Sequence, residues 1–113
     1  MKLTKIQKEL VSIGAGLIAL CIAATTLASE VTMVVQRDRK FQTQAVDIAA
    51  GDTVRFTNED PFIHQIYARS PSFSFSSDGQ PKGEVLSVPF PVAGTFQVLC
   101  EIHPKMLLTV NVR

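Results

Sequence analysis

The chain has 113 residues, of which 46% are hydrophobic, and a formal net charge of +1. After residue 28 it carries eight Lys or Arg against nine Asp or Glu, so no basic surplus indicates nucleic acid or an anionic membrane surface as a partner. Residues 29–113 have the length of one small domain, near the lower limit at which a hydrophobic core suffices without further cross-links. This segment contains one cysteine, Cys100, which excludes an internal disulfide.

The N-terminal segment has the layout of a secretory signal. Lysines near the start precede an apolar stretch over residues 10–27, and small residues close it. The stretch is also just long enough to span a bilayer, so an uncleaved anchor is the alternative. In both cases the lysines stay inside and the remainder crosses the membrane. We therefore expect a periplasmic protein in which residues 1–28 are the signal peptide or anchor and 29–113 the folded domain, with membrane contact only if the anchor is retained.

After residue 30, short β-rich runs recur at close spacing, and no helical periodicity is present. Val54 and Phe56, for example, alternate with polar neighbours, which predicts a strand with one buried face. Residues 70–84 are rich in Ser, Pro and Gly and predict a long loop with a short edge strand over 73–75. The predicted strands are 31–36, 45–50, 53–58, 62–68, 85–90, 95–100 and 107–112. Together they predict a single all-β domain, a small Greek-key β-sandwich or barrel of about seven or eight strands.

Three soft or borderline metal donors lie close together near the C-terminus, in "VLCEIHPKML". Cys100 ends a predicted strand, His103 lies in the loop that follows, and Met106 precedes the last strand. His64, the only other histidine, lies near another strand end in "NEDPFIHQ". A thiolate and two imidazoles with a weak axial thioether define the blue copper electron-transfer site, in which sulfur favours Cu(I) and imidazole suits both oxidation states.

The same residues resemble a known family. "CEIHPKM" is similar to the copper loop of cupredoxins, the small blue copper proteins that include plastocyanin, pseudoazurin and amicyanin, and its spacing and Pro104 look most like the amicyanin loop. "GDTVRFTNEDPFIHQ" resembles the family's G-D-x-V-x-F/W-x-N-x-D-x3-H stretch. "GEVLSVPFPVAGTFQVLCEIHPKM" resembles its G-E…F…G-x-Y/F-x-V-x-C-x2-H-x2-M run, so the resemblance covers nearly all of residues 30–113.

The resemblance implies one type 1 copper ion with His64, Cys100 and His103 as equatorial ligands and Met106 as the axial ligand. It places Gln65 where family members commonly have an Asn that joins the two ligand loops by a hydrogen bond. It also implies an electron carrier, not an enzyme, that meets transient redox partners such as a dehydrogenase, a cytochrome or an oxidase. His103 would be the exit for the electron. We expect a monomer that binds no nucleic acid.

Other interpretations compete with this one. Cys100 or Met106 alone would more often be buried core residues. A periplasmic copper carrier, buffer or sensor would bind Cu(I) and transfer the metal, but such proteins often have Met- or His-rich tracts, and none is present. A metal-free interaction domain or a zinc module fits less well, because zinc rarely takes methionine. A cysteine hydrolase would need a group that orients His103 as a base. Two histidines are too few for a multicopper oxidase or a copper nitrite reductase.

Overall fold

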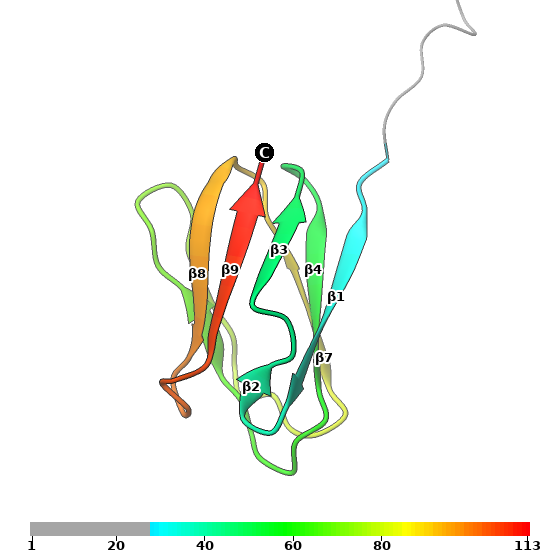
Figure 1. The fold of residues 1–113 in the computed structure, drawn as a ribbon, viewed down its shortest axis with the longest axis vertical. Helices are drawn as coiled ribbons and strands as arrows, with labels where there is room; N and C mark the ends of the chain where they lie inside the picture. The colour runs from blue at the N-terminus through cyan, green and yellow to red at the C-terminus, as the bar shows by residue number, and fades with distance from the viewer. Residues whose placement is uncertain (1–27) are drawn as a thin grey trace, which may run out of the picture.

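A computed structural model describes residues 28–113, which form a sandwich of two β-sheets (Figure 1). The first sheet has the order β2 (Lys40–Phe41), β1 (Val31–Arg37), β4 (Thr53–Asn58) and β7 (Val85–Pro89). The second has the order β3 (Ala45–Ile48), β9 (Leu107–Val112), β8 (Gly94–Cys100), β5 (Ile66–Ala68) and β6 (Phe75–Ser76). The all-β sandwich is thus confirmed. Within this range no helix is long and apolar enough to cross a membrane. The predicted signal peptide or anchor falls on residues 1–27, outside the described residues, and on Ala28.

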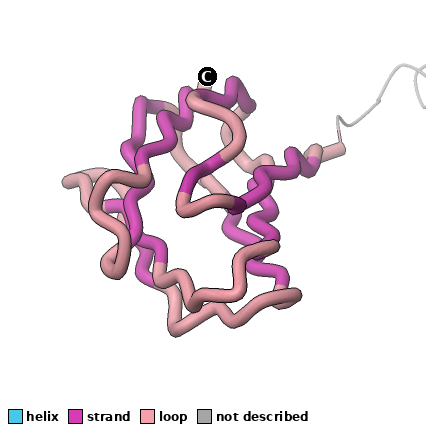
Figure 2. Tube along the Cα trace, turned by 60° about the horizontal axis from the view of Figure 1, so that its bottom comes forward, coloured by secondary structure: helices cyan, strands magenta, loops and turns pink. Residues whose placement is uncertain are grey.

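The strand directions bring several loops to one end of the sandwich. β1 pairs parallel with β4 and β3 pairs parallel with β9, whereas β8 is antiparallel to β9. Strands β1, β4 and β8 therefore finish at the end opposite the C-terminus, where Figure 1 shows the turn after β1 and the loops after β4 and β8. Figure 2 turns this end toward the viewer, with the strands of the two layers behind the connecting loops.

The predicted alternation of buried and exposed residues is confirmed in the core strands. Each of β3, β4, β8 and β9 buries every second residue, because side chains of a strand point alternately to opposite faces. Burial of these side chains between the sheets supplies the main stabilising free energy of a domain without a disulfide. The buried residues of these strands are Val46, Ile48, Val54, Phe56, Asn58, Phe96, Val98, Cys100, Leu108, Val110 and Val112.

Some predicted strand bounds differ from the structure. The strand predicted over 62–68 begins only at Ile66, because the backbone of His64 instead forms an isolated antiparallel bridge with Gln80. The edge strand of the long loop is Phe75–Ser76 rather than 73–75, and the two-residue strand β2 was not predicted. Within the loop, Phe73 packs on the core ring of Phe90, with ring centroids 5.2 Å apart.

Candidate metal centre

Two histidines and a cysteine meet at the end of the sandwich where β4 and β8 finish. Cys100 is the last residue of β8 and is fully buried, and His103 is half-buried in the loop before β9. His64 lies between β4 and β5 and is also buried. Its backbone N–H donates to the carbonyl of Gln80 at 3.1 Å, and the N–H of Gln80 donates back at 2.7 Å. This exchange fixes the backbone that carries the first histidine.

The three donor atoms face one another. Nδ1 of His64 lies 3.2 Å from Nδ1 of His103, and Sγ of Cys100 lies 3.7 Å and 4.0 Å from these two nitrogens. A transition metal such as zinc holds imidazole nitrogen at about 2.0 Å and thiolate sulfur at about 2.3 Å, so donors that share one such ion are roughly 3–4 Å apart. The observed separations match this range. The three residues predicted from the sequence are therefore brought together in an arrangement that fits one metal ion.

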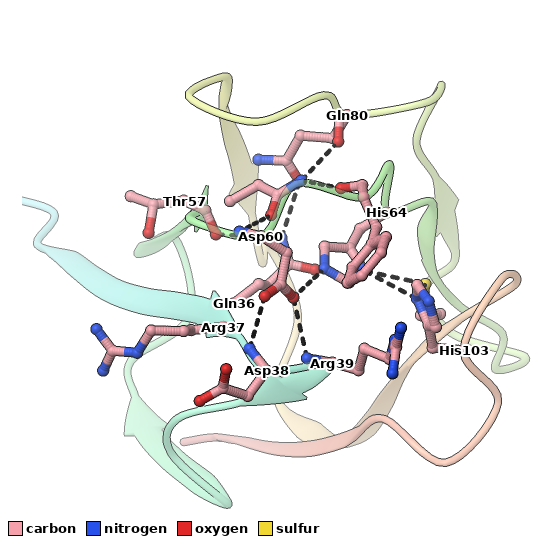
Figure 3. Close-up of polar contacts among 12 residues, drawn as sticks. Gln36, Arg37, Asp38, Arg39, Thr57, Asp60, His64, Gln80 and His103 are labelled. Carbon is pink, nitrogen blue, oxygen red and sulfur yellow. Dashed lines mark hydrogen bonds and ion pairs between the residues drawn. The ribbon is translucent and has the colours of Figure 1, made fainter.

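Asp60 orients the ring of His64 (Figure 3). Its Oδ2 lies 2.8 Å from Nε2 of His64, and both side chains are buried. Burial alone would raise the pKa of Asp60, but hydrogen bonds from the Arg39 backbone, from His64 and from the Asp38 backbone lower it below the ordinary value. An ionised carboxylate can only accept hydrogen bonds, so Nε2 of His64 carries the proton and Nδ1 presents its lone pair toward Cys100 and His103.

The second imidazole lies closer to the surface. Burial lowers the pKa of His103, and the neighbouring His64 and Arg39 lower it further. The neutral ring that these effects favour is the form that binds metals. The ring of Phe62 stands against that of His103 with centroids 6.0 Å apart, so an aromatic side chain flanks the more accessible of the two histidines.

Met106 is buried at the start of the last strand. Its backbone N–H donates to the carbonyl of His103 at 3.0 Å, which closes the loop between Cys100 and β9. This hydrogen bond keeps the loop compact and places Met106 at the site end of the core. The role of its thioether as an axial ligand stays a prediction.

A backbone hydrogen bond joins the segments that carry His64 and Cys100, and it does so at Gln65, the position where family members commonly have an Asn. The N–H of Glu101 donates to the carbonyl of Gln65 at 2.8 Å. The amide of Asn58 donates to the carbonyls of Phe62 at 2.8 Å and Gln80 at 2.9 Å. Both ligand loops are thus held by hydrogen bonds to main-chain carbonyls.

Two residues that support the site, Asp60 and Gln80, were not among the predicted site residues. Asp60 stands four residues before His64, and its place in N-x-D-x3-H was the signal that it contacts the histidine. Gln80 carries no comparable signal, because it lies in the polar segment 70–84. Its buried side chain donates to the carbonyls of Phe56 and Glu84 at 3.0 Å and 2.7 Å.

The chain is similar in sequence or in structure to several known proteins. No family model matches the chain. Amicyanin-alpha of Methylorubrum extorquens is 34% identical over 70 residues, which are 59% of this chain and 59% of the relative, so the chain spans less than two thirds of the curated relative it matches. Amicyanin from Paracoccus versutus has a similar structure, with a TM-score of 0.68 and 24% identity over 80% of this chain and 87% of the other.

Two further solved structures widen the comparison. A purple cupredoxin from Nitrosopumilus maritimus has a similar structure, with a TM-score of 0.65 and 20% identity. The match covers 73% of this chain and 99% of the cupredoxin. The copper-containing nitrite reductase of Thermus scotoductus has a TM-score of 0.68 and 25% identity, over 80% of this chain but only 24% of the enzyme. The structure therefore has the cupredoxin fold, and part of the chain is similar in sequence to amicyanin.

Proposed function

We propose that the chain is a one-copper electron carrier that works outside the cytoplasm and exchanges single electrons with transient protein partners. The observation that carries this proposal is the approach of two imidazole nitrogens and one cysteine sulfur, all within 4.8 Å of one another, at a single end of the sandwich. Sequence similarity to amicyanin supports the same function.

The donor set fits copper better than it fits other common metals. Thiolate sulfur favours Cu(I), imidazole suits both oxidation states, and a His2Cys set with a weak thioether is typical of blue copper centres. His64, Cys100 and His103 would hold the ion, with Met106 as the proposed axial ligand. Copper, when bound, would supply the one-electron couple between Cu(II) and Cu(I).

The protein's contribution is to hold these ligands still. His64 is fixed by its ring hydrogen bond to Asp60 and by its backbone exchange with Gln80, and Cys100 by its place in a strand. Such fixed ligands rearrange little when the charge of a bound ion changes. Both buried ligands are shielded from water, whereas half-buried His103 gives an edge toward a partner.

Copper transport without electron transfer is the main alternative. A metal-transfer protein needs ligands that can leave the ion in turn, whereas here two of the three predicted ligands are buried and braced. The similarity to the nitrite reductase does not indicate an enzyme, because it covers only 24% of the reductase chain. In addition, the two histidines of this chain would both belong to one site.

The test is to add Cu(II) to the purified chain and to record visible absorption and electron paramagnetic resonance. We expect an intense thiolate-to-copper band with narrow copper hyperfine splitting, which bleaches reversibly with reductant. Cys100→Ser should abolish the band. A chain that stays colourless and holds only Cu(I), or that reduces Cu(II) irreversibly while Cys100 is oxidised, would overturn the electron carrier in favour of copper transport.

A further inference from the structure

The surface beside His103 combines a shallow depression with exposed apolar side chains. Residues 38–40 and 102–105 line the depression, so it lies between the turn after β1 and the loop after β8. Phe62 and Ile102 next to it are 40% and 47% exposed. We call the surface formed by residues 38–40, Phe62 and residues 102–105 the exit face. Exposed apolar groups gathered around a half-buried ligand are suited to transient protein contact.

Positive charge dominates the exit face. Arg39, Lys40 and Lys105 line it against a single acidic residue, Asp38, and none of the three cations has an ion pair within residues 28–113. The nearby acidic residue Glu59 is paired with Arg37 at 2.8 Å. Since residues after 28 carry one more acidic than basic group, this concentration of unpaired cations is a local feature and not a property of the whole domain.

A second nearby acidic residue is also neutralised. Glu101, directly after the ligand Cys100, forms an ion pair with Arg69 at 3.0 Å. Asp60 is buried and hydrogen-bonded to His64. Apart from exposed Asp38, the acidic groups around the site are therefore paired or buried, whereas Arg39, Lys40 and Lys105 are exposed.

The cation next to His103 is held in place by the fold. Asp38 and Arg39 both have positive φ, 55° and 58°, in the tight turn between β1 and β2, a conformation that is uncommon for arginine. Oδ1 and Oδ2 of Asp60 accept their backbone N–H groups at 2.6 Å and 3.0 Å and so stabilise this turn. The turn brings the Arg39 guanidinium to 4.3 Å from the centre of the Phe62 ring. Phe62 in turn contacts His103.

We propose that the exit face docks an electron-transfer protein whose contact surface is apolar at its centre and ringed by carboxylates, which meet Arg39, Lys40 and Lys105. The proposal rests on the proposed function, which it extends by the chemistry of the partner. Opposite charges around an apolar contact accelerate encounter and orient the two proteins while leaving affinity modest, as repeated electron exchange requires.

The test compares one haem protein in two charge states. Cytochrome c is basic, and succinylation of its lysines makes it acidic. Electron transfer from the copper-loaded, reduced chain to each form is followed by stopped flow as ionic strength rises. We expect the rate constant to fall with salt for the succinylated form and to rise with salt for the native form, because screening weakens attraction and repulsion alike.

Substitutions of charged residues test which part of the surface accelerates electron transfer to succinylated cytochrome c. The double variant Arg39→Gln/Lys105→Gln should slow transfer to succinylated cytochrome c at low salt by about threefold or more. Arg113→Gln, which removes one positive charge at the opposite end of the sandwich (Figure 1), should change the rate little. Equal slowing by Arg113→Gln, or a rate with the succinylated form that rises with salt, would overturn the proposal.

A measurement on the copper-free chain separates this proposal from the proposed function. Amide chemical shifts of the labelled apoprotein are followed as succinylated or native cytochrome c is added. Shifts at residues 39–40 and 102–105 with the succinylated form alone support the docking surface even if no blue centre forms. Shifts elsewhere, or with both forms alike, contradict it even if the copper centre is confirmed.

Discussion

Nε2 of His64 donates to Oδ2 of Asp60 at 2.8 Å, and the same carboxylate accepts the backbone N–H groups of Asp38 and Arg39. One buried side chain thus connects the first predicted ligand to the turn that carries a cation of the exit face. Figure 3 shows Asp60 between these groups. Orientation of the ligand and shape of the proposed docking surface therefore depend on one residue.

Asp60→Asn should disturb both the orientation of His64 and the turn that carries Arg39. The amide is similar in size, but its NH2 group cannot accept a backbone hydrogen bond and its oxygen carries no full charge. We expect Cu(II) affinity to fall by about tenfold or more, as for other outer-shell partners of histidine ligands. The apoprotein should lose about 1–3 kcal/mol of unfolding free energy from the unsatisfied buried groups. The reduction potential should rise, because a negative charge that favours Cu(II) is lost.

Competitive Cu(II) titration, voltammetry and urea unfolding measure these three quantities. Asp38→Asn is the matched control, since it removes a neighbouring carboxylate that is exposed, and we expect its unfolding free energy to change by less than about 0.5 kcal/mol. If the two variants alter affinity and potential equally, overall charge rather than the hydrogen bond to His64 is responsible.

Met106→Leu tests the proposed axial ligand. The substitution nearly conserves volume in a buried position, so the unfolding free energy of the apoprotein should change by less than about 1.5 kcal/mol. Loss of a bound thioether should nevertheless shift the visible bands and raise the reduction potential, because a donor above the metal is removed. Spectroelectrochemistry of the two proteins decides the point. Identical spectra and potentials would make Met106 a core residue only.

The parts of this structure that depend on local sequence patterns could be predicted. Alternating apolar residues fix which face of a strand is buried, so the inward positions of β4, β8 and β9 follow from period-two patterning. Cys100 and His103 are near each other in the chain, and a strand end with a short loop suffices to present both donors. With only one further histidine in the chain, His64 was the natural third partner.

Features that depend on contacts between distant segments could not be predicted in the same way. The backbone N–H groups of residues 38–39 donate hydrogen bonds to Asp60 from a turn that has positive φ at two non-glycine residues. No Gly or Asn in the sequence indicated this turn. Strand β2 has two residues, too few for any periodicity. Gln80 comes from a polar loop, and only tertiary packing places it beside His64.

Gln65→Ala should leave the site almost unchanged. The connection between the two ligand segments runs from the Glu101 N–H to the Gln65 carbonyl, and alanine retains that carbonyl. We expect Cu(II) affinity to stay within about twofold and the unfolding free energy within about 0.5 kcal/mol, as for other substitutions that remove no buried contact. Competitive titration and urea unfolding check this. A loss of affinity comparable to that of Asp60→Asn would show that the side chain, not the backbone, supports the ligand loops.

Asp52→Asn should destabilise the apoprotein in a pH-dependent manner. Hydrogen bonds from the backbone N–H groups of Glu30 and Ala49, both 2.9 Å long, lower the pKa of Asp52. A carboxyl group with a lowered folded-state pKa stabilises the fold above its unfolded pKa of about 3.9, and this contribution disappears as pH falls through the folded-state value. The difference in unfolding free energy between wild type and variant should thus be largest at neutral pH and shrink below about pH 4. Urea unfolding at a series of pH values measures it, with Asp78→Asn, an exposed carboxylate, as the control. A difference that stays constant down to about pH 2 would mean that the charge of Asp52 contributes nothing and that only its shape matters.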